Sequence, residues 1–320
     1  MAATRPDPLA FLSTELDALK RQGLYRTLRV LEGEQKPEAT FDHHSVVNLS
    51  SNNYLGLTTH PHLRERALAA IRDFGVGSGS VRTIAGTMAV HMELERRLAV
   101  FKKTEAVVVF QSGFTANAGT VSAVLSKDDV VISDELNHAS IIDGSRLSRA
   151  AIKVFPHKDV DAARAIARGL PASQRKLLIT DGVFSMDGDL GALPGLCQVA
   201  EEFGCIMMVD DAHASGVFGT NGRGTIDHFG VHGRVDIQVG TLSKAIGVLG
   251  GYVAGTARSS TFCTTAPGLF CSPLRIRRRS PPPASRRSMF SSRSRESSTA
   301  CGRTRASSRP DCRVSASTPA

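Results

Sequence analysis

The sequence contains no tryptophan, only three tyrosines and no uninterrupted apolar run of eighteen residues, the length that a membrane-spanning helix needs. The six cysteines have no regular spacing, so they predict neither a disulfide framework nor a CxxC metal-binding pair. Residues 1–12 lack the basic and then apolar pattern of a signal peptide. We therefore expect a globular cytoplasmic protein without a bound metal.

Lysine is absent from residues 256–320, which contain 13 arginines and two acidic residues. Residues 1–255 contain 26 basic and 28 acidic side chains, so the net charge of +9 comes from this tail alone. The tail is rich in Arg, Ser and Pro without periodicity, which is typical of disorder. One hypothesis is a basic tail that binds nucleic acid or an anionic membrane. The other is a reading-frame error.

Seven short apolar runs, most of them separated by segments of helical length, predict a mainly parallel sheet with helices on both faces. Amphipathic spacing over residues 8–31 predicts one or two helices, and residues 46–49 predict a short strand. Further helices are expected over residues 61–74 and 91–102. The predicted strands of the large sheet are residues 106–110, 130–133, 152–155, 176–180, 205–209, 236–239 and 251–254.

Two of these strand ends carry candidate chemistry. Lys244 follows the run 235–239 on the turn leaving a strand, where a desolvated amine can form a Schiff base. Asp210 directly follows the run 205–209. Open α/β sheets place their chemistry at the carboxyl ends of strands, so this pair suggests pyridoxal phosphate, whose ring nitrogen needs an acidic partner. Taken singly, such a lysine is usually a surface charge and such an aspartate can be a helix cap.

Five motifs in register carry a family resemblance. The motifs are 51–56 (SNNYLG), 133–140 (SDELNHAS), 181–188 (DGVFSMDG), 209–213 (VDDAH) and 241–244 (TLSK). They resemble the α-oxoamine synthases, fold-type I pyridoxal phosphate enzymes that condense an amino acid with an acyl-CoA thioester. The resemblance implies an α/β transferase fold with a cofactor-binding large domain at 51–255, an N-terminal helical arm and short strand at 1–50, and a homodimer.

The resemblance also implies roles for individual residues. Lys244 would hold the cofactor and act as the base that removes the substrate α-proton, and His138 would stack on the cofactor ring and adjoin the substrate. Asp210 would contact the ring nitrogen and His213 the phenolic oxygen. The remaining implied contacts are Ser185 and Thr241 to the cofactor, the backbone N–H groups of Ser112, Gly113 and Phe114 to its phosphate, and Asn52 to the substrate carboxylate.

The stretch 137–144 (NHASIIDG) looks most like glycine C-acetyltransferase, an enzyme of threonine degradation. We therefore expect condensation of glycine with acetyl-CoA to give 2-amino-3-oxobutanoate and CoA. The alternative within the family is 8-amino-7-oxononanoate synthase, which joins alanine to a pimeloyl thioester with loss of CO₂ in biotin biosynthesis. The alternative of another class is an inactive truncated chain or a basic-tailed binding protein. The acyl-chain length depends on pocket shape, which the sequence does not disclose.

The resemblance ends near Gly255, where the family continues into a helix, a loop and a C-terminal domain with a carboxylate-binding arginine. When residues 261–280 are read one nucleotide earlier with permissible synonymous codons, they give a string close to that continuation. We hypothesise that the frame slips between about residues 255 and 260, which leaves the C-terminal small domain missing and the chain weak or inactive. A nucleotide sequence with one continuous frame across this point would reject the hypothesis.

Overall fold

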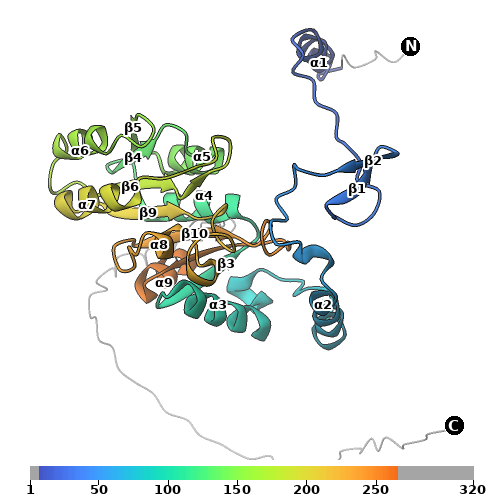
Figure 1. Cartoon of the computed structure of the whole chain (residues 1–320). Helices are drawn as coiled ribbons and strands as arrows, with labels where there is room; N and C mark the ends of the chain where they lie inside the picture. The colour runs from blue at the N-terminus through green and yellow to red at the C-terminus, as the bar shows by residue number, and fades with distance from the viewer. Residues whose placement is uncertain (1–6, 266–320) are drawn as a thin grey trace, which may run out of the picture. The chain divides into compact units, whose positions relative to one another are not determined.

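The computed structural model describes residues 7–265, and its largest feature is a seven-stranded sheet (Figure 1). The strand order is β3-β11-β10-β9-β6-β4-β5. Six strands run parallel, and β11 lies antiparallel between β3 and β10. This sheet confirms the predicted α/β fold class. The strands are β3 (Ala106–Phe110), β4 (Val130–Asp134), β5 (Ala151–Phe155), β6 (Lys176–Asp181), β9 (Ile206–Asp210), β10 (Ile237–Thr241) and β11 (Gly251–Gly255).

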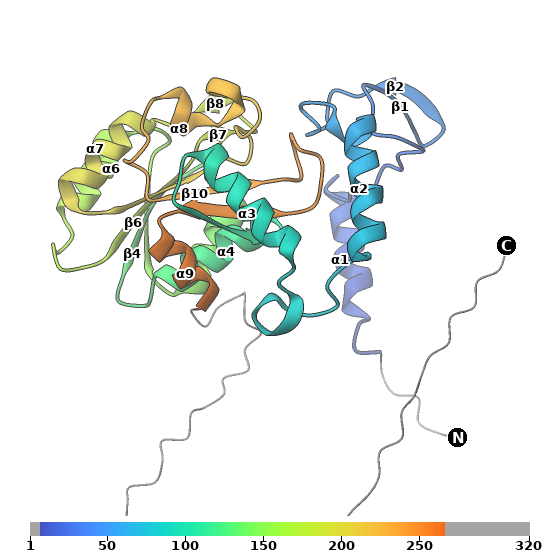
Figure 2. The same cartoon turned by 90° about the horizontal axis from the view of Figure 1, so that it is seen from below.

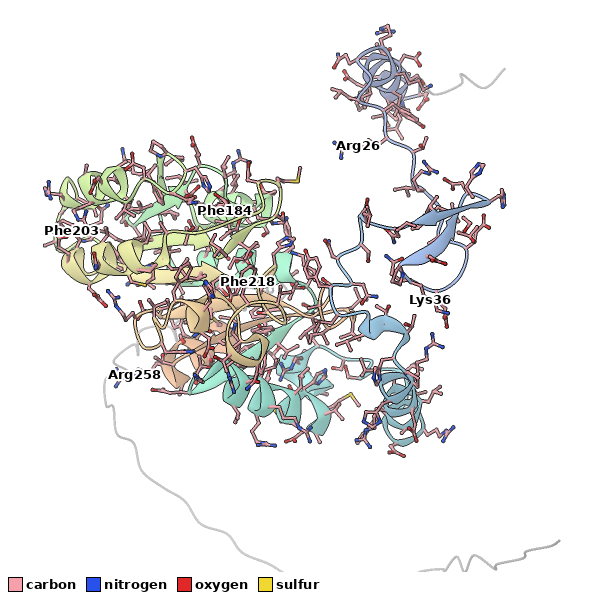
Figure 3. The ribbon with its side chains drawn as sticks, in the orientation of Figure 1. Arg26, Lys36, Phe184, Phe203, Phe218 and Arg258 are labelled. Carbon is pink, nitrogen blue, oxygen red and sulfur yellow. The ribbon has the colours of Figure 1, made fainter. Side chains whose placement is uncertain are left out.

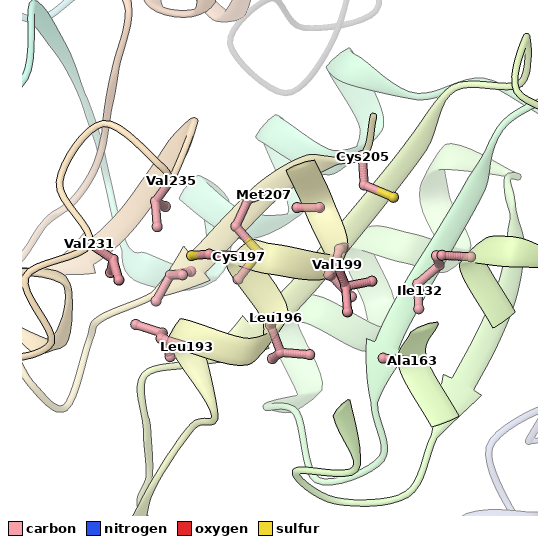
Figure 4. Packing of buried hydrophobic residues seen from close by; sticks show 14 of the residues in the cluster. Ile132, Ala163, Leu193, Leu196, Cys197, Val199, Cys205, Met207, Val231 and Val235 are labelled. Atoms are coloured by element: carbon pink, nitrogen blue, oxygen red, sulfur yellow. The ribbon is translucent and has the colours of Figure 1, made fainter. Parts of the chain in front are cut away.

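Helices cover both faces of the sheet, and every residue of the central strands β4, β6 and β10 is buried (Figure 2). In β4, Val131 contributes to the core under one helical layer, while Ile132 contributes to the opposite core (Figure 4). The first layer contains α4 (Gly113–Val124), α5 (Ala139–Ser148) and α9 (Ala257–Thr265). The second contains α3 (Ala89–Lys102), α6 (Val160–Arg168), α7 (Leu193–Phe203) and α8 (Thr225–His228).

The elements before the sheet have exposed apolar faces. The amphipathic segment 8–31 contains one helix, α1 (Phe11–Arg21), and α2 (Pro61–Phe74) has the predicted bounds. None of the residues in these two helices is buried, and Leu12, Leu16 and Leu19 are exposed. The short strand expected at 46–49 is β2 (His44–Val47), which pairs with an unpredicted β1 (Glu38–Phe41). Short helical turns are η1 (Leu57–Thr59), η2 (Arg82–Gly86) and η3 (Thr220–Gly222).

Helix α9 lies inside the segment 256–320 that we expected to be a disordered or out-of-frame tail. It contacts β3, β11 and α4, and its residues Ser260 and Cys263 are buried. The rest of that segment, residues 266–320, lies outside the described residues. Among the helices between residues 7 and 265, none is long and apolar enough to cross a membrane.

Candidate active site

Four neighbouring strands end in polar residues at the same edge of the sheet. These are Asp134 on β4, Asp181 on β6, Asp210 on β9 and Thr241 on β10. Asp181 and Asp210 are register partners on adjacent parallel strands. A cleft of about 200 Å³ opens at this edge. It is lined by Ser112, Gly113, Phe114, His138, Ser140, Asp181, Asp210, Ala212, His213, Thr241, Ser243 and Lys244.

The cleft brings together eight of the ten residues that the sequence singled out, and the two exceptions are Ser185 and Asn52. Ser185 follows Phe184, which is labelled in Figure 3, and is exposed in the turn between β7 (Val183–Phe184) and β8 (Asp189–Leu190). Asn52 is exposed and accepts a hydrogen bond from the Tyr54 hydroxyl at 3.2 Å. That hydroxyl lies 2.7 Å from His213 Nδ1, so Asn52 reaches the cleft only through Tyr54.

Lys244 is positioned by the loop that leaves β10, and its Nζ lies 2.6 Å from His213 Nε2. Burial lowers the pKa of Lys244, although Asp210 and Asp181 oppose this shift. Burial, together with the nearby Lys244 and His138, lowers the pKa of His213 to about 4. His213 is therefore neutral at pH 7, and the amine beside it is more readily deprotonated than an exposed lysine.

Two buried carboxyl groups form the floor of the cleft. Asp210 accepts hydrogen bonds from Asn117 Nδ2 at 2.6 Å and from the backbone N–H of Ala212 at 2.9 Å. Burial nevertheless raises the pKa of Asp210. Burial and the neighbouring Asp210 also raise the pKa of Asp181. Two adjacent buried acids of this kind favour a cationic partner in the cleft, because a positive charge restores their ionised forms.

His138 is held on both sides by neighbouring groups at the start of α5. Its backbone N–H donates to Asp181 Oδ2 at 2.9 Å. Its ring Nδ1 accepts from the backbone N–H of Ser140 at 3.2 Å and lies 2.7 Å from the Ser140 hydroxyl. In the neutral ring the hydrogen is consequently on Nε2. Asp181 and Ser140 thus fix the orientation of His138, and the sequence assigned a role to neither of them.

The N-terminus of α4 also lines the cleft. Ser112 caps this helix, since its hydroxyl accepts from the Thr115 N–H at 3.1 Å. The N–H groups of Gly113 and Phe114 have no partner within the helix and provide an anion site at its positive end. A Cβ at Gly251 would lie 2.3 Å from the Ser112 carbonyl oxygen, so only glycine lets β11 pass this close.

These groups fit pyridoxal phosphate, the cofactor that the sequence predicts. The cleft offers free N–H groups for a phosphate, an amine for an aldehyde and, at the end of β9, a buried acid for a ring nitrogen. Burial raises the pKa of Asp210, and a positively charged ring nitrogen beside it would lower that pKa again. The carboxylate and the ring cation would therefore stabilise each other's charged forms.

The β7–β8 hairpin that carries Ser185 is tied to the sheet through His157. His157 Nδ1 lies 3.0 Å from Asp134 Oδ1, and its Nε2 lies 3.1 Å from Asp189 Oδ2. Lys158 Nζ also donates to Asp189, at 2.9 Å. Burial opposes the charged imidazole, but the two carboxylates outweigh burial and raise the pKa of His157.

Replacing His157 with glutamine is expected to destabilise the protein mainly at low pH. A histidine whose pKa is raised by folding stabilises the fold fully below its unfolded value of about 6.5, and this stabilisation is lost as pH rises through the folded pKa. The free energy of unfolding in urea, measured between about pH 5.5 and pH 9, should differ most between variant and wild type at the acidic end. A difference independent of pH would contradict these ion pairs. His44→Gln, at an exposed position, is the control.

Comparison with known proteins gives a consistent family relationship. The aminotransferase class I and II family model matches residues 44–278. The 8-amino-7-oxononanoate synthase of Thermoanaerobacter pseudethanolicus is 57% identical over 248 residues, which are 77% of this chain and 63% of that protein. The 8-amino-7-oxononanoate synthase 1 of Bacillus subtilis is 56% identical over 246 residues, with the same two shares. The chain thus spans less than two thirds of the length of these curated relatives.

Solved structures show the same fold. Serine palmitoyltransferase of Sphingomonas wittichii is 34% identical and superposes with a TM-score of 0.75, covering 81% of this chain and 66% of that one. The 8-amino-7-oxononanoate synthase of Francisella tularensis is 29% identical with a TM-score of 0.57, covering 67% of this chain and 60% of that one. The family match extends to residue 278, beyond Gly255, where we had placed the end of the resemblance.

Proposed function

Because this chain belongs to the aminotransferase class I and II family, among its α-oxoamine synthases, we propose that it acts as an 8-amino-7-oxononanoate synthase. In this proposal it joins alanine to a pimeloyl thioester, releasing the thiol and CO₂. The cleft carries the proposal, since Lys244 and Asp210 approach it from neighbouring strand ends. The names and 56–57% identity of the curated relatives support the choice of substrates.

The expectation of glycine and acetyl-CoA as substrates is wrong. The curated relatives at 56–57% identity are named 8-amino-7-oxononanoate synthase, the alternative that the sequence left open. The expectation was based on residues 137–144, which cover the turn into α5 and the first part of that helix. His138 and Ser140 of that stretch line the cofactor cleft, and Asn137 bonds to the backbone of β6. This stretch therefore belongs to the proposed cofactor site, which both activities share, and says nothing about the length of the acyl chain.

The prediction of pyridoxal phosphate as cofactor is confirmed by the family to which the chain belongs. When bound, this cofactor withdraws electrons from the α-carbon of an amino acid and so makes its proton removable. The protein's part is to bind it, orient the amino acid and transfer the proton. We propose that Gly113 and Phe114 bind the phosphate through their N–H groups and that Asp210 pairs with the ring nitrogen.

In the proposed reaction Lys244 is both the attachment point of the cofactor and the base for the α-proton. Its lowered pKa increases the fraction of neutral amine, which is the form that accepts a proton. His138 is proposed to lie against the cofactor ring, with Asp181 and Ser140 holding it. His213 and Tyr54, hydrogen-bonded to each other, are proposed to contact the phenolic oxygen side. Roles for Thr241, Ser112, Ser185 and Asn52 remain predictions.

A homodimer is the proposed assembly. Helices α1 and α2 present apolar residues such as Leu16, Leu68 and Ile71 to the surface, and no residue of either helix is buried. Exposed apolar area of this extent is typical of an interface with another subunit. The cytoplasmic location expected from the sequence remains a prediction.

The substrate proposal predicts a preference for alanine over glycine and for the pimeloyl over the acetyl thioester. One methyl group in an apolar pocket changes kcat/KM by roughly 10–200-fold, so kcat/KM for L-alanine should exceed that for glycine by such a factor. The cofactor-loaded chain is titrated with each amino acid while its visible spectrum is recorded. Thiol release is then measured with pimeloyl-CoA and with acetyl-CoA.

Lys244→Ala serves as the inactive control for thiol release in this assay. Higher kcat/KM with glycine and acetyl-CoA than with alanine and pimeloyl-CoA would refute the substrate proposal. A spectrum that responds to L-alanine in a chain that releases no thiol would locate the defect in the acyl half of the reaction.

A further inference from the structure

A buried ion pair lies behind the cleft and takes no part in lining it. Lys102, the last residue of α3, has a side chain only 1% exposed, and Asp211 is completely buried. Lys102 Nζ donates to Asp211 Oδ2 at 3.0 Å. Taking two charges out of water is costly unless their remaining hydrogen-bonding groups are satisfied, so such a pair needs closely fitted surroundings.

The surroundings of this pair are fitted to it. The Asp211 carboxylate also accepts from the Thr225 hydroxyl at 2.5 Å and from the Thr225 N–H at 3.1 Å. Lys102 Nζ donates in addition to the Arg223 carbonyl oxygen. A Cβ at Gly224 would lie 1.7 Å from Asp211 Oδ2, and one at Gly182 would lie 2.5 Å from Oδ1. Glycines on two sides therefore let the backbone close around this carboxylate.

The pair is connected to the cleft through the turn that follows β9. Asp211 is flanked by Asp210 and is two residues from His213, both of which line the cleft. The backbone of Asp211 holds the turn as well, because its N–H donates to the Val239 carbonyl and its carbonyl accepts from the Ser215 N–H, each at 2.8 Å. Any displacement of Asp211 therefore moves the carboxyl of Asp210 and the ring of His213.

We propose that Lys102 and Asp211 are positioning residues, which fix the turn 210–215 so that Asp210 and His213 face the cofactor in their working geometry. The inference rests on the proposed cofactor site and adds to it a residue from α3, a helix that contributes nothing to the cleft lining. The ion pair links α3, the turn after β9 and the segment around Thr225. By holding the turn against α3 and the Thr225 segment, the ion pair keeps Asp210 in a fixed position.

Lys176 provides a matched control. Its side chain is as deeply buried, at 2% exposed, and its Nζ donates to the carbonyl oxygens of Pro171 and Gln174. It lies at the start of β6, the end of that strand opposite the cleft. Lys176→Met therefore removes a buried lysine without touching the turn. Both methionine variants should lower the midpoint of urea unfolding.

Two measurements on Lys102→Met and Lys176→Met test the proposal. Hydrogen exchange of peptides covering residues 206–216 is measured in the cofactor-free protein, and the dissociation constant of pyridoxal phosphate is measured from its visible absorption. We expect faster exchange in these peptides and at least tenfold weaker cofactor binding for Lys102→Met only. Exchange at the wild-type rate in Lys102→Met would overturn the proposal, whether or not the cofactor binds.

A double variant addresses misfolding. The single variant Lys102→Met leaves Asp211 as an unpaired buried charge. The double variant, Lys102→Met with Asp211→Asn, removes that charge as well. The double variant should regain stability but retain both the fast exchange and the weak cofactor binding. Wild-type values of both would mean that the pair serves stability alone and would overturn the proposal. A wild-type chain that binds no pyridoxal phosphate would instead refute the proposed function, while the exchange data still decide the role of the ion pair.

Discussion

Replacing Lys244 with alanine is expected to abolish the visible absorption that borohydride removes and to reduce thiol release by roughly 10²–10⁴-fold, the usual contribution of a positioned base. The reason is geometric as well as chemical. Lys244 lies in the cleft with its Nζ 2.6 Å from His213 Nε2, and burial lowers its pKa. Alanine removes both the proposed attachment point and the proton acceptor. Absorption spectra before and after borohydride, together with the thiol assay, measure the two losses separately.

An exposed lysine provides the control for this variant. Lys127 lies in the loop between α4 and β4, away from the cleft, so Lys127→Ala should keep both the absorption band and the turnover of the parent chain. If Lys244→Ala retained a band that borohydride removes, another amine would be the attachment point. The assignment of Lys244 would then be wrong.

Asp210→Asn is expected to have the second largest effect, a loss of roughly 10²–10³-fold in turnover, which is typical for removal of a preorganised electrostatic group. Asparagine has nearly the same shape and can still accept from the Ala212 N–H, so the fold should survive. It cannot carry the negative charge that pairs with a protonated ring nitrogen. Burial raises the pKa of Asp210, and the bound ring should reverse that shift by supplying a positive charge.

The visible spectrum distinguishes this electrostatic loss from simple unfolding. Asp210→Asn should still bind pyridoxal phosphate through the helix N-terminus and Lys244, but with a shifted pH dependence of the band. Asp129→Asn is the matched control, because Asp129 is also buried but caps the loop before β4 by accepting from the Ser126 N–H. Turnover and band of the Asp210 variant equal to those of the wild type would remove Asp210 from the mechanism.

The sheet was predictable from the sequence because its strands are short apolar runs with helical segments between them. The predicted strand 106–110 has the observed bounds, and the strand expected at 236–239 runs from Ile237 to Thr241. The helix 61–74 was equally clear, since Pro61 begins it and Gly75 follows it. Strand β1 was missed because its four residues, Glu38–Phe41, contain no apolar run and depend on pairing with β2.

The cleft was predictable as far as its residues lie in motifs at strand ends. Asp181 lies in such a motif, but its role depends on a register pairing with Asp210 that only the folded sheet creates. Tyr54 reaches His213 across 159 positions of sequence, and such long-range contacts leave no local pattern. Ser185 was placed on the cofactor by resemblance, whereas the hairpin leaves it exposed. Substrate choice was missed because the motif used for it, residues 137–144, lies at the cleft that we propose for the cofactor.

The antiparallel position of β11 has a consequence for synthesis of the chain. Its partner β3 is the earliest strand of the sheet, and the two are separated by about 145 positions. Within the described part of the chain, β3 has no other neighbour in the sheet. At the ribosomal rate of roughly 5–20 residues per second, β3 therefore waits on the order of ten seconds for its partner. During this time β3 has no strand partner, and its unpaired edges are sites where chaperones or misassembly compete with folding.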